Sequence, residues 1–206
     1  EGEAARHKEQ YEQLINSKGD QNPYLLHREL GQTMTKNVTV VRYNQGIEET
    51  LAKIDELAER YKRVAIADTS NWTNQNLSFT RALGDMLIMA RVIARGALLR
   101  NECRGAHYKP DYAIPAPKGG DPETVRTEAV RWVQAFRKQT QEWLKTTIAE
   151  YTPDGPKISY EQVDTSLIPP RPRTYGLVGA EIIEQVWRDT QSADEKAAQQ
   201  AQPAGA

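Results

Sequence analysis

The 206-residue sequence contains one cysteine and two phenylalanines, and it has no apolar run long enough to cross a bilayer. Cys103 alone cannot form an internal disulfide, which favours a reducing compartment such as the cytoplasm. A membrane-spanning helix needs roughly eighteen or more apolar residues in succession. The net charge of −1 gives no general attraction to nucleic acid or to an anionic membrane surface. We therefore expect neither nucleic-acid binding nor direct membrane insertion.

The sequence also lacks the motifs that bind dinucleotides and metals. No Gly-x-Gly-x-x-Gly follows a predicted strand, so no segment is expected to hold a dinucleotide pyrophosphate. Cys103 and His107 stand four residues apart, but Asp111 is a weak third ligand and no fourth follows, so we expect no metal site. A Cys–His nucleophilic pair has no further support in the sequence. No signal peptide or initiator methionine is present, and we expect the chain to be cut from a longer protein.

The feature that dominates the sequence is a long apolar segment from Asn74 to Arg100. Its apolar residues recur every three or four positions, as on one face of a helix. Further apolar residues flank that face, so we expect other elements to surround this helix as the centre of the core. The face comprises Phe79, Leu83, Met86, Leu87, Ala90, Ile93, Ala94, Ala97 and Leu98, and the flanks comprise Leu77, Ile88, Val92 and Leu99.

The remaining pattern predicts a mainly α fold. It would be an antiparallel bundle of three to four principal helices, with a small β-hairpin and a proline-rich C-terminal strap. Residues 46–63 form the clearest amphipathic helix, and Pro153-Asp-Gly-Pro156 marks the hairpin turn. The predicted parts are a polar N-terminal helix (1–20), the bundle core (21–111), an inserted helix, hairpin and strap packed on the bundle (112–175), a C-terminal helix (176–191) and a disordered Ala/Gln tail (192–206).

Polar residues crowd together directly after the apolar helix. The candidates for a site are Arg104, His107, Lys109 and Asp111, grouped around Gly105. One interpretation is a helix C-terminus, at which the cations meet the negative end of the helix dipole and Asp111 pairs with one of them. In that case these residues are purely local structure.

Four segments resemble succinate dehydrogenase and fumarate reductase flavoprotein subunits, in the same order along the chain. Asn101-Glu-Cys-Arg-Gly-Ala-His107 is similar to the Glu-Ser-Arg-Gly-Ala-His segment near their C-terminus, with Cys103 where Ser is common. Residues 61–70 resemble the segment that links two bundle helices in these subunits. Phe79-Thr-Arg-Ala-Leu83 resembles part of their long helix. Ser166-Leu-Ile-Pro-Pro-Arg-Pro-Arg-Thr-Tyr175 resembles the terminal Pro-Pro-x-x-Arg-x-Tyr signature.

The resemblance implies that the chain is the C-terminal helical region of such an oxidoreductase. The parent would use FAD to interconvert succinate and fumarate in the tricarboxylic acid cycle or in electron transport. It would pass electrons to an iron–sulfur subunit and a membrane anchor, peripheral on the cytoplasmic face of the inner membrane. The glycine-rich dinucleotide-binding motif, the catalytic residues and the flavin-binding residues of the parent would lie upstream. The fragment would therefore hold no cofactor and no catalytic residue, and it would be inactive alone.

For the four candidate residues, the resemblance implies an interface with the flavin and capping domains of the same subunit. Direct contact with flavin or substrate is a further alternative. Two rivals stay open for the chain as a whole. L-aspartate oxidase and related flavoproteins share a similar tail, although the Pro-Pro-Arg-Pro-Arg-Thr-Tyr end disfavours them. A free-standing helical-bundle interaction module would also fit residues 46–63 and 74–100.

Overall fold

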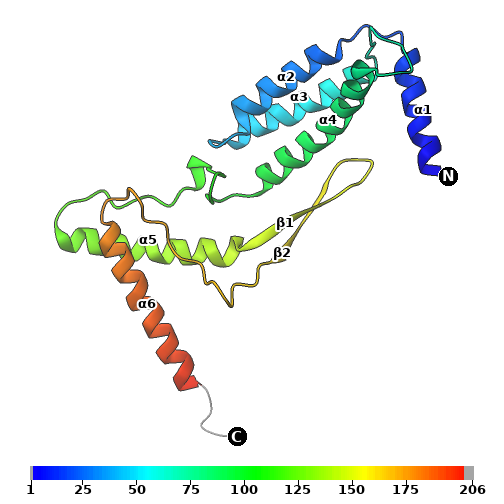
Figure 1. The fold of residues 1–206 in the computed structure, drawn as a ribbon. Coiled ribbons are helices and arrows are strands. Elements are labelled where there is room, and N and C mark those ends of the chain that lie inside the picture. The colour runs from blue at the N-terminus through cyan, green and yellow to red at the C-terminus, as the bar shows by residue number, and fades with distance from the viewer. Residues whose placement is uncertain (1, 202–206) are drawn as a thin grey trace, which may run out of the picture. The chain divides into compact units, whose positions relative to one another are not determined.

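The structure, a computed structural model, describes residues 2–201, with side chains up to residue 194. The chain divides into two compact units, each with its own hydrophobic core (Figure 1). The first unit comprises Glu1–Tyr112 and Thr147–Ser159, and the second comprises Ala113–Thr146 and Tyr160–Ala206. In the described part of the chain, no helix is both long and apolar enough to cross a membrane.

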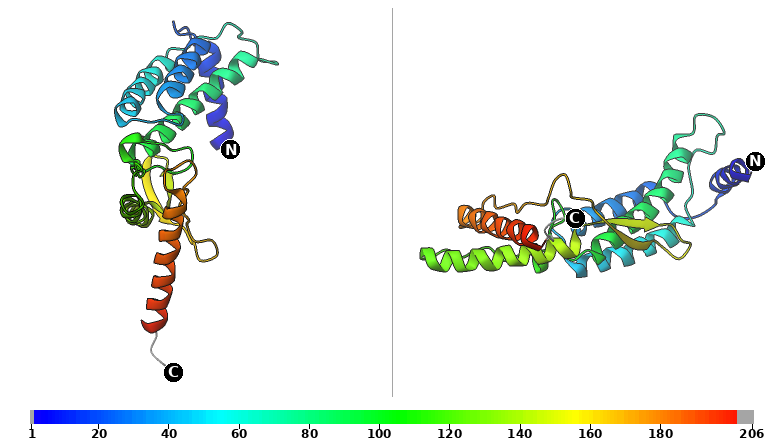
Figure 2. Two further views of the ribbon diagram at one scale, coloured as in Figure 1. Left: turned by 90° about the vertical axis from the view of Figure 1, so that its left-hand side faces the viewer. Right: turned by 90° about the horizontal axis from the view of Figure 1, so that it is seen from below.

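The first unit contains four helices: α1 (Gly2–Asn16), α2 (Pro23–Asn37), α3 (Asn44–Tyr61) and α4 (Gln75–Leu99). Helices α2, α3 and α4 run side by side in alternating directions, as Figures 1 and 2 show. Helix α1 packs on α4. The predicted helical bundle with a small hairpin is confirmed.

The helix boundaries follow from capping residues that the sequence shows. The side chain of Asn22 accepts hydrogen bonds from the N–H groups of Tyr24 and Leu25, and Asn74 accepts one from Leu77. These caps satisfy backbone donors that a helix N-terminus leaves unpaired. Pro23 at the start of α2 has a φ that already suits the helix.

The core of the first unit is built from one face of each of α2, α3 and α4. In α4 this face is Leu83, Leu87, Ala90, Ala94 and Ala97, all buried as predicted. Ile93 and Met86 were expected on the same buried face, but they are 49% and 39% exposed. Met86 and Ile93 therefore do not belong to the core of the first unit, so the expected core face of α4 was too broad. The other core residues are Leu26, Leu30, Val38, Ile47, Ile54, Leu57 and Val64.

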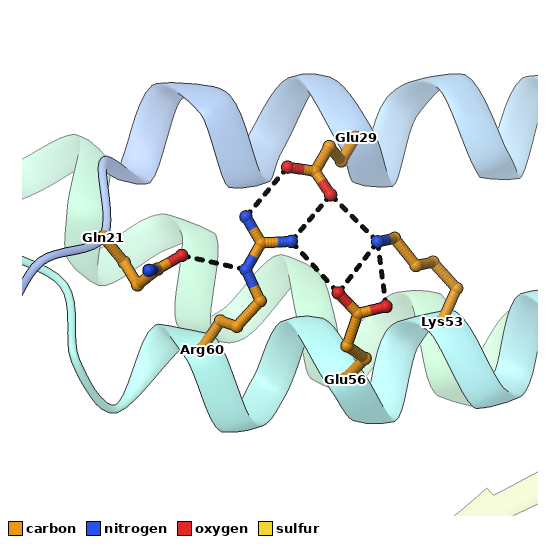
Figure 3. Close-up of polar contacts among 5 residues, drawn as sticks. All are labelled: Gln21, Glu29, Lys53, Glu56 and Arg60. Carbon is orange, nitrogen blue, oxygen red and sulfur yellow. Dashed lines mark hydrogen bonds and ion pairs between the residues drawn. The ribbon is translucent and has the colours of Figure 1, made fainter.

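A network of charged side chains joins α2 to α3 across their surface (Figure 3). The Arg60 guanidinium binds both carboxylate oxygens of Glu29, at 2.7 and 2.9 Å. Lys53 contacts Glu29 at 2.9 Å and Glu56 at 2.9 Å. Arg60 also donates to the side chain of Gln21 at 2.8 Å. Hydrogen bonds from Arg60 and Lys53 lower the pKa of Glu29 to about 2, which means that the carboxylate is ionised at neutral pH.

The hairpin pairs β1 (Lys145–Glu150) with β2 (Lys157–Gln162), close to the predicted positions. Its turn is closed by hydrogen bonds between Thr152 and Gly155, the latter at a φ of +121°. The two units share this hairpin, because its tip belongs to the first and its base to the second.

The second unit consists of α5 (Pro122–Trp143), an extended segment without helix or strand, and α6 (Ala180–Ala201). Helix α6 packs on α5 through an apolar cluster. Helix α6 continues beyond residue 191, where the predicted helix ends. The Ala, Glu, Gln and Lys residues that follow this position are good helix formers. Residues 202–206 of the predicted tail lie outside the described residues. The cluster comprises Ala129, Trp132, Val133, Ile183, Val186 and Trp187.

Candidate functional site

The candidate residues lie in a compact corner that follows α4, which comprises residues 100–112. The backbone N–H groups of Arg104 and His107 each donate to the other's carbonyl, at 2.8 and 3.0 Å, which closes a tight turn. Gly105 sits in this turn at a φ of +58°, a conformation that glycine adopts without the steric cost of a Cβ. A short 3₁₀ helix, Pro110–Tyr112, ends the corner.

Two backbone hydrogen bonds attach the corner to the loop between α2 and α3. The N–H of Tyr108 donates to the carbonyl of Val40 at 3.1 Å, and the N–H of Arg42 donates to the carbonyl of Tyr108 at 2.9 Å. The corner is therefore fixed to the bundle at Val40 and Arg42, far from Tyr108 in the sequence.

A completely buried carboxylate, that of Glu102, organises the corner. The guanidinium of Arg104 contacts it at 3.0 Å and that of Arg100 at 2.5 Å. Arg100 also donates to the hydroxyl of Thr147 at 3.2 Å. This hydrogen bond connects the corner to the part of the hairpin that belongs to the first unit. A buried charge is tolerated only when it is paired and hydrogen-bonded, and two guanidinium groups satisfy that requirement.

Lys109 is also buried, with a side chain that is 1% exposed. Its ammonium donates to the carbonyl of Leu98 at 2.9 Å and to the side-chain oxygen of Asn101 at 3.0 Å. The Leu98 carbonyl belongs to the last turn of α4, where acceptors lack a partner within the helix. Burial, together with the positive charge of Arg42, lowers the pKa of Lys109 to about 8. Lys109 thus caps the C-terminus of α4 from inside the protein.

His107 is neutral, and its tautomer follows from its two neighbours. Arg42 can only donate, so Nδ1 of His107 accepts from the Arg42 guanidinium. Nε2 then carries the proton and donates to the carbonyl of Arg100 at 2.8 Å. Burial lowers the pKa of His107, and the positive charges of Arg42 and Lys109 lower it further. His107 therefore links the α2–α3 loop to the end of α4.

Arg104 and Asp111 are the two candidates that reach solvent. The Arg104 side chain is 38% exposed, and Asp111 is exposed at the start of the 3₁₀ helix. Asp111 makes no ion pair among the side chains described, so the expectation that it pairs with a neighbouring cation is wrong. The acceptor that takes this role is Glu102, which is closer in sequence to both arginines.

Cys103 does not have the environment of a reactive thiol. Its Sγ lies 3.1 Å from the carbonyl of Lys109, to which it donates. Burial raises the pKa of Cys103, whereas a nucleophilic cysteine requires a lowered pKa. Among the described residues, no group of three or more His, Cys, Asp or Glu side chains could hold a metal ion.

The corner therefore carries surplus positive charge. Within residues 100–112, Arg100 and Arg104 pair with the buried carboxylate of Glu102, and Lys109 donates to two uncharged oxygens. These three cations outnumber the carboxylates of Glu102 and Asp111, while His107 is neutral. Chemically, this arrangement positions backbone elements and can attract an anionic group.

Comparison with known proteins identifies the chain. Residues 27–175 match the family described as fumarate reductase flavoprotein C-term, which is well over half of the sequence. The chain belongs to this family. The corner and most of α2, all of α3 and α4, and the hairpin all lie inside the matched part of this flavoprotein region.

The relatives of this flavoprotein region are much longer proteins. It is 44% identical to the succinate dehydrogenase flavoprotein subunit of Bacillus subtilis over 172 residues, 82% of this chain and 25% of that protein. It is 31% identical to the fumarate reductase flavoprotein subunit of Escherichia coli over 177 residues, 85% of this chain and 26% of that protein. A solved E. coli quinol fumarate reductase is similar at a TM-score of 0.66 and 30% identity, over 85% of this chain and 26% of that one. The chain thus spans about a quarter of the length of these relatives.

Sequence reasoning missed Glu102 in the corner and Arg42, which contacts the corner from the α2–α3 loop. Glu102 stands inside the quoted motif, but a glutamate flanked by arginines at positions 100 and 104 is more often exposed than buried. The two neighbouring arginines were the signal that it could be paired. Arg42 is sixty-five positions from His107, and no local pattern links them.

Proposed function

We propose that the chain is the C-terminal helical domain of a flavoprotein subunit that interconverts succinate and fumarate. The family match over residues 27–175 supports this most directly. In the whole subunit, FAD and the residues that act on the dicarboxylate would lie upstream of this domain. The subunit would pass electrons to an iron–sulfur subunit and a membrane anchor, with the complex on the cytoplasmic face of the membrane.

Within that subunit, the corner would form part of the interface with the flavin and capping domains. His107 and Lys109 would hold its shape, because their hydrogen bonds attach it to the end of α4 and to the α2–α3 loop. Arg104 and Asp111 would face the other domains, because their side chains reach solvent. The surplus positive charge would favour an anionic group on the partner surface.

The test of the activity uses the complete subunit that contains this chain. With FAD bound, it should oxidise succinate and reduce fumarate with artificial electron carriers. The 206-residue chain alone should bind no FAD in a fluorescence titration, because it lacks a dinucleotide fingerprint. Oxidation of L-aspartate with no turnover of either dicarboxylate would contradict the proposal, as would micromolar FAD binding by the chain alone.

The interface role of Arg104 has its own test. In the isolated chain, Arg104→Ala should cost about 1 kcal/mol, because Arg100 still pairs with Glu102. In the complete subunit, the same change should also reduce flavin retention and turnover. Arg126→Ala is a matched control, because Arg126 is exposed and its ion pair with Asp189 is long, at 3.9 Å. If the Arg104→Ala subunit has a normal flavin content and a normal turnover rate, Arg104 has a local structural role only.

A further inference from the structure

One contact between the corner and the α2–α3 loop depends on the protonation state of a histidine. Nδ1 of His107 accepts a hydrogen bond from the guanidinium of Arg42, a group that can only donate. A proton on Nδ1 would occupy the accepting lone pair, so two donors would face each other. It would also place an imidazolium cation against the guanidinium cation. Both side chains are half-buried, so water would separate the two charges poorly.

The Arg42 side chain is held in place by a second set of hydrogen bonds. Its Nε donates to the carbonyl of Val38 at 3.2 Å and to that of Thr39 at 2.6 Å. Both carbonyls lie just beyond the C-terminus of α2, where a cation is favourable because of the helix dipole. Repulsion from a charged His107 would therefore act on the contact between loop and corner rather than turn Arg42 away from α2.

The other hydrogen bonds of His107 do not depend on its charge. Nε2 carries a proton in both states, so it can donate to the carbonyl of Arg100 in both. The tight turn between Arg104 and His107 is closed by backbone groups only. Protonation would therefore weaken the attachment to the loop and leave the attachment to α4 intact.

The charges around His107 oppose its protonation on balance. Burial is the largest cause that lowers the pKa of His107, and the positive charges of Arg42 and Lys109 lower it further. The hydrogen bond from Nε2 and the carboxylate of Glu102 act in the opposite direction. Two arginines already pair with Glu102, so this carboxylate compensates little of the positive charge.

We propose that His107 is a pH switch, whose protonation in acid detaches the α2–α3 loop, residues 38–43, from the corner. Detachment breaks two backbone hydrogen bonds, from the N–H of Tyr108 to Val40 and from the N–H of Arg42 to Tyr108. All of these groups belong to the first unit, so the switch operates whether or not the proposed function is correct.

The direction of the pH dependence follows from the lowered pKa of His107. Once the loop is detached, the imidazole is free to protonate with an ordinary pKa of about 6.5. The attached state is therefore fully favoured above about pH 6.5 and loses stability as the pH falls below that value. Because one proton is involved, the equilibrium constant for detachment should rise by up to about tenfold per pH unit.

Amide hydrogen exchange followed by NMR tests the switch in the 206-residue chain. Protection factors, corrected for the intrinsic effect of pH on exchange, are measured at pH 7 and pH 5. The amides of Arg42 and Tyr108 should lose about tenfold in protection at pH 5, in line with uptake of one proton. The amide of Leu87 in the core of α4 should keep its protection, which separates local detachment from global unfolding.

A substitution at His107 separates this switch from other effects of acid. In His107→Gln, the amide oxygen can accept from Arg42 and the NH₂ group can donate to Arg100, and neither group titrates. The protection of the Tyr108 amide should then be the same at pH 7 and pH 5. His27→Gln is the matched control, because His27 is exposed on α2, and it should leave the acid response unchanged.

A substitution at Arg42 gives a second test if His107→Gln does not fold. In Arg42→Gln, the amide oxygen can accept a hydrogen bond from protonated His107, and the repelling charge is gone. The acid response of the Tyr108 amide should therefore shrink. In the unmodified chain, NMR of ¹⁵N-labelled imidazole should show a neutral ring with the proton on Nε2 at pH 7.

Four results would overturn the proposal. They are a proton on Nδ1 of His107 at pH 7, equal protection of the Tyr108 amide at pH 7 and pH 5, an acid response that persists in His107→Gln, and loss of Leu87 protection together with that of Tyr108.

Discussion

Lys109 is buried and has no carboxylate partner among the described side chains, and its environment makes the stability of the protein depend on pH. The folded state lowers its pKa from the usual 10.5 to about 8. Below pH 8 both states hold the proton, so Lys109 contributes no pH dependence. Between pH 8 and 10.5 the unfolded chain binds the proton and the folded chain does not, so stability rises with pH in this window.

The variant Lys109→Met should abolish that rise. The free energy of unfolding of the unmodified protein should gain about 2–3 kcal/mol relative to the variant between pH 8 and 10.5. Urea denaturation at several pH values measures the difference. The exposed Lys62→Met is a control for the loss of a lysine as such. Parallel pH profiles for the unmodified protein and Lys109→Met would show that Lys109 is solvated.

Glu29 gives a pH dependence at the acid end. Its pKa is lowered from 4.5 to about 2, so its contribution to stability is complete above about pH 4.5 and is lost as the pH falls through 2. Glu29→Gln should therefore destabilise the protein at pH 7 by about 1 kcal/mol, since the pair is partly solvated. The deficit should shrink toward pH 2. Glu12→Gln on the exposed face of α1 should have no effect at either pH, and a constant deficit for Glu29→Gln would contradict this explanation.

Residue types and their spacing predicted the position of the corner but not its internal pairing. The motif around Gly105 located the turn and its cations correctly, because a glycine with a positive φ and a helix end leave a local signature. The contact of Arg42 with His107 depends on how α2 and α3 pack, which no local pattern contains. The burial of Glu102 depends on the same tertiary context.

At the scale of elements, the closeness of α3 and α4 rests on a glycine. A Cβ at Gly84 would lie 2.8 Å from the hydroxyl oxygen of Tyr61, which donates to the carbonyl of Thr80 at 2.9 Å. Gly31 lies in the middle of α2, and no atom beyond the neighbouring backbone of its own helix is within 4 Å of its would-be Cβ. The same substitution at the two positions should therefore have opposite effects.

Gly31→Ala should stabilise the protein by about 0.5–1 kcal/mol, because alanine favours the helix. Gly84→Ala should destabilise it by about 1–2 kcal/mol, because Tyr61 has to move and its hydrogen bond to Thr80 is lost. Thermal and urea denaturation of both variants measure the difference. A stabilised Gly84→Ala would mean that the Tyr61 ring shifts without cost.

The helices themselves were largely predictable, since capping residues and amphipathic periodicity are local. Asn22, Asn74 and Asp121 each cap the N-terminus of a helix. Periodicity could not show how much of α4 is covered, because a buried and an exposed apolar residue look the same in sequence. Ile93, expected in the core but 49% exposed, is the clearest case.

At the scale of the whole molecule, the tryptophans report on one unit only. Trp132, Trp143 and Trp187 are buried and all belong to the second unit, while Trp72 is 84% exposed. Helix content, in contrast, lies in both units. Since each unit has its own core, urea denaturation followed by fluorescence and by far-ultraviolet circular dichroism should give different midpoints. Trp72→Phe removes the exposed emission as a control, and coincident curves would show a single cooperative unit.

The shared hairpin has a consequence for how the gene can be divided. The chain passes from one unit to the other after Tyr112, after Thr146 and after Ser159, so neither unit is a continuous stretch of the coding sequence. A stop codon or a single protease cut will therefore leave each unit incomplete or still tethered to the other. Only a rearranged gene, in which the residues of one unit are joined by a new linker, could deliver that unit separately.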